Sequence, residues 1–62
     1  MVEVKWIALV KKDGKKRIVT RTLVGVDLDD VNFQIHEYVD LLEEAGNTLI
    51  MNGISGIRTI PT

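Results

Sequence analysis

The chain has 62 residues, a formal net charge of -1, 45% hydrophobic and 27% charged residues, and no cysteine. This composition is typical of a globular protein and argues against a disordered one. The absence of cysteine excludes disulfides, thiolate metal ligands and a cysteine nucleophile, and we expect a cytoplasmic protein. The length predicts a single domain over residues 1–62, with a core so small that surface burial against a second copy would add to its stability.

The N-terminal segment, MVEVKWIALVKK, predicts a strand and indicates neither a signal peptide nor a membrane span. Its apolar residues alternate in the period-2 pattern of a strand, which we expect over residues 2–10. The pair Asp13-Gly14 follows and favours either a two-residue turn or the end of a three-residue loop with a bulge. Residues 17–26 are rich in β-branched side chains and predict the second strand of a hairpin.

The length of the hairpin loop decides which side chains share a face of the sheet. A three-residue loop over residues 12–14 collects the most apolar side chains on the face that a helix would cover, so we predict that loop. The opposite face would then present four apolar side chains among charged ones, namely Ile7, Leu9, Val19 and Leu23. Such a patch is too large to remain exposed in a monomer. We expect it to bind a second copy or another protein, unless the C-terminal segment folds over it.

Residues 29–45 carry the pattern of an amphipathic helix. Asp27 or Asp29 is available as the N-cap, acidic residues occupy the first turn, and Gly46-Asn47 is a stop signal. The apolar residues recur at helical spacing and form a stripe that would cover the hairpin. This stripe consists of Leu28, Val31, Ile35, Tyr38, Val39, Leu42 and Ala45.

The C-terminal segment, TLIMNGISGIRTIPT, is expected to be extended at residues 48–51 and 57–60. It forms either a hairpin that turns at Asn52-Gly53 or one longer strand that bulges at its glycines, so the element order is ββαβ or ββαββ. The predicted fold class is α+β, a small antiparallel sheet of three to four strands with one helix packed on a face. This order resembles that of many small sheet-and-helix proteins, including compact phage-encoded inhibitors of host enzymes, and no motif assigns the chain to one family.

We find no catalytic, cofactor-binding or metal-binding motif in the sequence. His36 is the only histidine, and there is no cysteine or second histidine with which it could bind zinc. Ser55 has no base near it in the sequence, and the glycines form neither a P-loop nor a dinucleotide fingerprint. We therefore expect no enzyme activity and no cofactor.

Positive and negative charges separate along the chain. Seven of the eight basic residues lie within the first 21 positions, and seven of the nine acidic residues lie between Asp27 and Glu44. The predicted hairpin is therefore positive and the predicted helix is negative. The small net charge conceals a dipole, and each pole has to be considered separately as a binding surface.

This charge map supports two hypotheses for the function. The leading one is a non-catalytic protein-binding module, an inhibitor or adaptor that acts as a homo-oligomer. Its helix would offer one aromatic and three acidic residues to a basic partner, namely Phe33, Glu37, Asp40 and Glu44. The alternative is nucleic-acid binding by the basic hairpin, with candidate contacts at Lys11, Lys12, Lys15, Lys16, Arg17 and Trp6.

Overall fold

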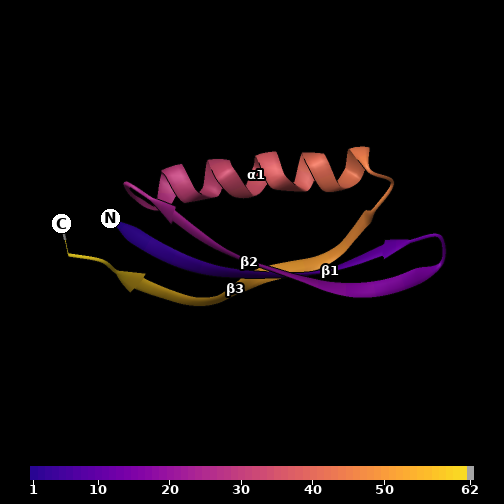
Figure 1. The fold of residues 1–62 in the computed structure, drawn as a ribbon, viewed down its shortest axis with the longest axis horizontal. Coiled ribbons are helices and arrows are strands. Elements are labelled where there is room, and N and C mark those ends of the chain that lie inside the picture. The colour runs from indigo at the N-terminus through magenta and orange to yellow at the C-terminus, as the bar shows by residue number, and fades with distance from the viewer. Residues whose placement is uncertain (62) are drawn as a thin grey trace.

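The computed structural model describes residues 1–61, in which three strands and one helix follow the order ββαβ. β1 (Val2–Lys12) and β2 (Lys15–Gly25) form a hairpin, α1 (Leu28–Glu44) follows, and β3 (Thr48–Thr59) is the last element. The strands form one sheet in the order β2-β1-β3, and α1 packs on one face of it (Figure 1). The predicted α+β class is confirmed, in its three-stranded form.

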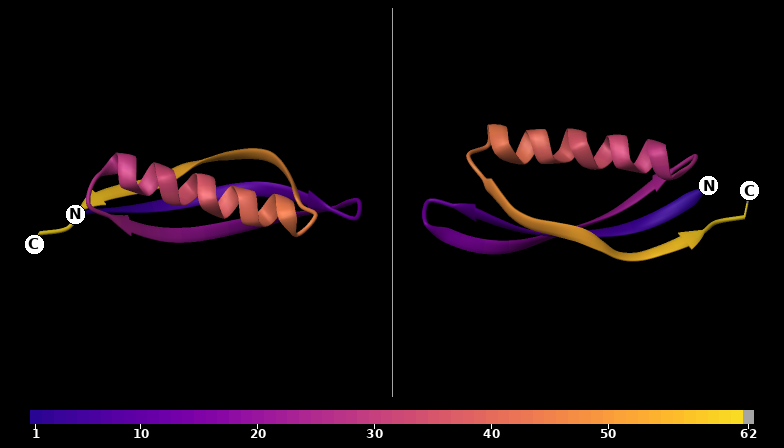
Figure 2. Two further views of the ribbon diagram at one scale, coloured as in Figure 1. Left: turned by 90° about the horizontal axis from the view of Figure 1, so that it is seen from above. Right: turned by 180° about the vertical axis from the view of Figure 1, so that it is seen from behind.

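The central position of β1 explains why α1 lies where it does. Both β2 and β3 run antiparallel to β1, so they are parallel to each other and occupy opposite edges of the sheet. The chain must cross the sheet between them, and α1 makes this crossing, running diagonally along the sheet (Figure 2). A single crossing covers one face only, and no element of residues 1–61 covers the other face (Figure 1).

The hairpin closes through a two-residue turn, Asp13-Gly14, and not through the predicted three-residue loop. Both residues have positive φ, 52° for Asp13 and 78° for Gly14, as a type I′ turn requires. This turn follows the right-handed twist of the flanking strands, which pair over eleven rungs without a shift of register. The twist of two long strands therefore selects the tighter turn.

The shorter turn moves the register by one residue and exchanges the two faces of β2. Val4 pairs with Leu23 and Ala8 pairs with Val19, and both β2 residues pack against the core beneath α1. The prediction that placed Val19 and Leu23 on the exposed face is therefore wrong. Ile18 takes their place on the face that α1 does not cover, where it is 68% exposed.

α1 begins at Leu28, one residue before the predicted start, with Asp27 as its N-cap. The Asp27 side chain accepts a hydrogen bond from the backbone N–H of Asp30 at 2.9 Å. The Asp30 carboxylate in turn accepts a hydrogen bond from the backbone N–H of Val26 at 3.0 Å. This reciprocal pair is a close variant of the capping box and fixes the direction in which α1 leaves β2.

α1 ends in a Schellman motif, in agreement with the stop signal at Gly46-Asn47. The backbone N–H of Asn47 donates to the carbonyl of Leu42 at 3.0 Å, and that of Gly46 donates to the carbonyl of Glu43 at 2.9 Å. Gly46 has a φ of 93°, in the left-handed region that favours glycine. The buried side chain of Asn47 also donates to the Leu42 carbonyl at 3.0 Å, which ties the start of β3 to the helix.

The core lies between α1 and the central strand β1. Trp6, the largest fully buried side chain, is 1% exposed. Its ring meets that of Tyr38 edge to face with centroids 5.6 Å apart, and its indole N–H donates to the Asn52 side chain at 3.2 Å. Leu28 and Ala45, at the two ends of the predicted stripe, are exposed. The buried hydrophobic residues are Val4, Trp6, Ala8, Val10, Val31 and Leu42.

β3 is one continuous strand, so the bulged alternative is the one observed. Its register against β1 shifts at two places, between Lys5 and Trp6 and between Leu9 and Val10. These bulges bend the strand and let it follow the curved sheet (Figure 2). Asn52-Gly53, the turn of the alternative hairpin, lies inside the strand and pairs with β1.

The molecule is elongated and thin, with extents of 43, 19 and 12 Å. The hairpin tip projects beyond the end of α1 (Figure 1). The accessible surface is 4483 Å², whereas a compact monomer of this mass would expose about 4,000 Å². The chain therefore exposes more surface than its size requires, and several large hydrophobic side chains are among the exposed residues.

We expect Gly25→Ala to destabilise the fold. A Cβ atom at this position would lie 2.7 Å from Oδ2 of Asp30 and 2.9 Å from Cγ2 of Val31, so it would disturb both the N-terminus of α1 and the core. The free energy of unfolding, measured by urea denaturation, should fall by about 1–3 kcal/mol. Gly53→Ala is the matched control, because its Cβ would meet open space. Equal losses in the two variants would contradict the prediction.

Candidate functional site

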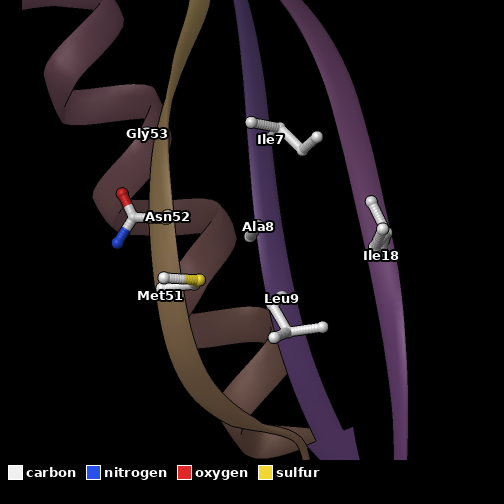
Figure 3. Close-up of a pocket in the computed structure, with 7 residues that line it drawn as sticks. All are labelled: Ile7, Ala8, Leu9, Ile18, Met51, Asn52 and Gly53. Carbon is white, nitrogen blue, oxygen red and sulfur yellow. The ribbon is translucent and has the colours of Figure 1, made fainter.

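The face of the sheet opposite α1 carries an apolar surface to which all three strands contribute. Leu9 of β1 pairs with Ile18 of β2 on one side and with Met51 of β3 on the other. Together with Ile7 they line a shallow hollow of about 290 Å³ on the side of the sheet away from the helix (Figure 3). We call this surface the bare-face patch, and it consists of Ile7, Leu9, Ile18 and Met51.

The side chains of the bare-face patch are exposed to a degree that folding does not require. Ile18 is 68% exposed, Met51 is 63% exposed and Ile7 is 38% exposed, while Leu9 is half-buried between them. Apolar groups gathered in this way on a small monomer indicate a binding surface. Sequence reasoning identified Ile7 and Leu9. It missed Ile18 and Met51, because their face depends on the turn and on the bulges.

Lysine residues surround the bare-face patch. Lys5 and Lys11 flank the patch residues of β1 and share their face. Lys16, which pairs with Lys11, lies there too, and all three side chains are exposed. Glu3 is the only acidic residue of the three strands, and its carboxylate lies 3.3 Å from the Arg58 guanidinium. This face is therefore apolar at its centre and positive at its rim.

The outer surface of α1 is a second candidate and has the opposite charge. Phe33 is 62% exposed and lies opposite the buried Leu42 on the helix, so it stays out of the core as expected. Leu41, to which the sequence pattern assigned no role, is also 61% exposed. We call this outer surface the acidic helix face, and it consists of Phe33, Glu37, Asp40, Leu41 and Glu44, all of them exposed.

The carboxylates of the acidic helix face have no cationic partner within residues 1–61. The ion pair found in this part of the chain joins Arg58 to Glu3, on the far side of the sheet. No basic residue lies between Asp27 and Glu44. The negative charge of the acidic helix face is therefore available to a partner molecule.

The hairpin tip is exposed, but the aromatic residue predicted to assist it is not. Trp6 is a core residue that is 1% exposed, so its ring is not available to stack on a base. The Tyr38 ring is covered by Arg21, whose guanidinium carbon lies 4.5 Å from the ring centroid. The tip therefore offers charge without a stacking platform. Its exposed basic residues are Lys11, Lys12, Lys15, Lys16 and Arg17.

Serine and histidine, the residue types considered for catalysis, lie on different elements of this structure. The Ser55 hydroxyl donates a hydrogen bond to the Lys5 carbonyl at 3.2 Å, and His36 is exposed on α1. Within residues 1–61, no group of three or more His, Cys, Asp or Glu side chains is placed to hold a metal ion. In the same part of the chain, no helix combines the length and the apolarity needed to span a membrane.

Ile18→Thr and Val10→Thr form a matched pair that tests whether the bare-face patch serves the fold. Ile18 is 68% exposed and Val10 is fully buried, and threonine keeps the β-branched shape of both. We expect Ile18→Thr to change the free energy of unfolding of the monomer by less than about 0.5 kcal/mol. Val10→Thr should lower it by about 1–3 kcal/mol, because it buries a hydroxyl group. Equal losses in urea denaturation would show that the patch is part of the core.

We compared the chain with known proteins by family, by sequence and by structure. No protein-family model, no curated protein and no solved structure matches it. The function is therefore inferred from the bare-face patch and the acidic helix face, whose geometry and charge are described above.

Proposed function

We propose that this protein is a non-catalytic protein-binding module, an inhibitor or adaptor that acts as a homo-oligomer. The bare-face patch carries the proposal. Ile18 and Met51 project from a sheet face that no element of residues 1–61 covers, and both are more than 60% exposed. Full burial of one such side chain contributes about 1.5–3 kcal/mol. A chain this small gains from burying apolar surface against a second molecule.

The size of the sheet face limits the interface that it can form. The 19 Å extent of the molecule runs from the helix to the sheet, so the sheet face spans 43 by 12 Å (Figure 1). Its area of about 500 Å² is smaller than the area of about 800 Å² that each partner contributes to a standard protein–protein interface, so the bare face alone would form a small one. The apolar centre and lysine rim of the bare face also follow the usual arrangement of an interface core and its polar rim.

The acidic helix face gives the module a second binding surface. Phe33 supplies an aromatic anchor, the residue type that most often dominates interface energies together with arginine. The surrounding carboxylates would speed association with a basic surface and exclude an acidic one. An inhibitor or adaptor needs such a surface of defined charge, because charge complementarity distinguishes one partner from another.

Ile18→Glu should abolish self-association. A carboxylate within the bare-face patch would have to be buried without a partner in the apolar interface. We expect sedimentation velocity to show a mass that rises with concentration for the wild type and a constant monomer mass for Ile18→Glu. Val26→Glu is the control, because Val26 is 76% exposed and lies outside the patch, and it should behave as the wild type. A wild-type chain that is monomeric at every concentration contradicts the proposal.

The exposed hairpin tip supports a second candidate function, nucleic-acid binding. Five basic side chains of the tip are exposed, at positions 11, 12 and 15–17. The tip also extends beyond the C-terminal end of α1 (Figure 1). Contacts from the tip would be to phosphates and would lack sequence specificity, because the buried Trp6 cannot read or stack bases.

A salt titration tests this second function. Binding of labelled single-stranded DNA or RNA through four phosphates should give a slope of log K against log salt of about -3. The double variant Lys12→Gln and Lys15→Gln should reduce the magnitude of that slope by about 1.4. Lys5→Gln, distant from the tip on β1, should leave it unchanged. The absence of binding at low salt would remove this function.

A further inference from the structure

We propose that the acidic helix face of one copy docks on the bare-face patch of the next copy, head to tail. The inference rests on the proposed function, which it deepens by naming the surface of the second copy that binds. It depends on two observations: the position of these two surfaces on opposite sides of one molecule, and their complementary charge.

The two surfaces lie on opposite sides of the sheet. α1 covers one face and turns Phe33, which is 62% exposed, away from the strands. The bare-face patch lies on the other face, with the helix behind it (Figure 3). A contact between two different surfaces of identical chains is heterologous, and it repeats unless the chain of contacts closes into a ring. Each added copy would present the same two surfaces again.

Charge distinguishes the head-to-tail contact from the two symmetric alternatives. A face-to-face dimer of bare sheets would bring Lys5, Lys11 and Lys16 of one copy against the same lysines of the other. A helix-to-helix dimer would bring unpaired carboxylates against carboxylates. The head-to-tail contact places the lysines against the acidic helix face, where Glu37, Asp40 and Glu44 are exposed. It is the arrangement of these three in which opposite charges meet.

The apolar groups of the two surfaces also match in shape. The hollow of about 290 Å³ in the bare-face patch is lined by Ile7, Leu9 and Ile18, and Gly53 adds no side chain to it. Phe33 lies on the convex outer surface of α1 and provides a ring that can enter such a hollow. Docking would give every inner sheet a helix on both of its faces, the layered arrangement in which sheets bury both sides.

The experiment combines two variants that each disable one surface. Ile18→Glu blocks the bare-face patch and leaves the acidic helix face intact. Phe33→Lys removes the aromatic anchor, places a positive charge on the acidic helix face and leaves the bare-face patch intact. We expect each variant alone to sediment as a monomer. We expect an equimolar mixture to form a 1:1 dimer and nothing larger, because the two surfaces left over in that dimer are the disabled ones.

The wild type and a control variant complete the design. The mass of the wild type should rise with concentration beyond that of a dimer, and added salt should weaken both its association and that of the mixture. Leu28→Lys makes the same change on α1 at a residue that is 53% exposed but faces away from the acidic helix face. It should associate as the wild type does. Circular dichroism establishes that all variants fold.

The remaining outcomes overturn the inference in distinguishable ways. If Phe33→Lys dimerises alone and the mixture adds nothing, the bare-face patch binds itself, and the proposed homo-oligomer stands without the head-to-tail contact. If the wild type associates but the mixture stays monomeric, the two surfaces do not bind each other. If the wild type is monomeric at every concentration, the proposed homo-oligomer fails together with the inference.

Discussion

A chain of side-chain contacts through Trp6 joins all four elements of this fold. The indole ring of Trp6 on β1 meets Tyr38 of α1 edge to face at 5.6 Å, and its N–H donates to Asn52 of β3 at 3.2 Å. Arg21 of β2 lies over the Tyr38 ring, with its guanidinium carbon 4.5 Å from the ring centroid. Helix and sheet are thus held together by one tryptophan that has an apolar body and a satisfied polar atom.

The position of Trp6 determines which face of the sheet is free. Its burial beneath α1 brings the helix onto the face that also carries Val4, Ala8 and Val10. The alternate residues of β1, among them Ile7 and Leu9, must then point to the other side. Since residues 1–61 contain one helix, Ile7 remains exposed together with Ile18 and Met51, and Leu9 is only half-buried. The candidate binding surface is thus a direct consequence of how the core forms.

This packing places the acidic and the basic segments of the chain on opposite sides of the molecule. The acids of α1 face outward on one side of the sheet, and the lysines at the rim of the bare-face patch lie on the other. A chain with a net charge of -1 therefore has two surfaces of opposite sign, one on the outer side of the helix layer and one on the outer side of the sheet. This polarity supports a module that recognises partners by charge, including further copies of itself.

Local patterns were sufficient to predict the elements and the outer surface of the helix. The cap at Asp27, the stop at Gly46-Asn47 and the exposure of Phe33 follow from interactions within a few residues along the chain. The same holds for the strands of the hairpin and for the exposed basic tip. These features depend on short-range propensity, capping and helical spacing, which a sequence contains in full.

The composition of the bare-face patch could not be predicted in the same way. At Asp13-Gly14, a two-residue turn and a three-residue loop were both compatible with the sequence. The two differ by one residue in register, and this shift exchanges the faces on which Val19 and Ile18 lie. Met51 reached the patch only through the bulges of β3. The sequence by itself determined the order of elements, their ends and the two charged poles. The tertiary structure alone decided which apolar side chains remain uncovered, because strand twist and register depend on the packing of the whole sheet.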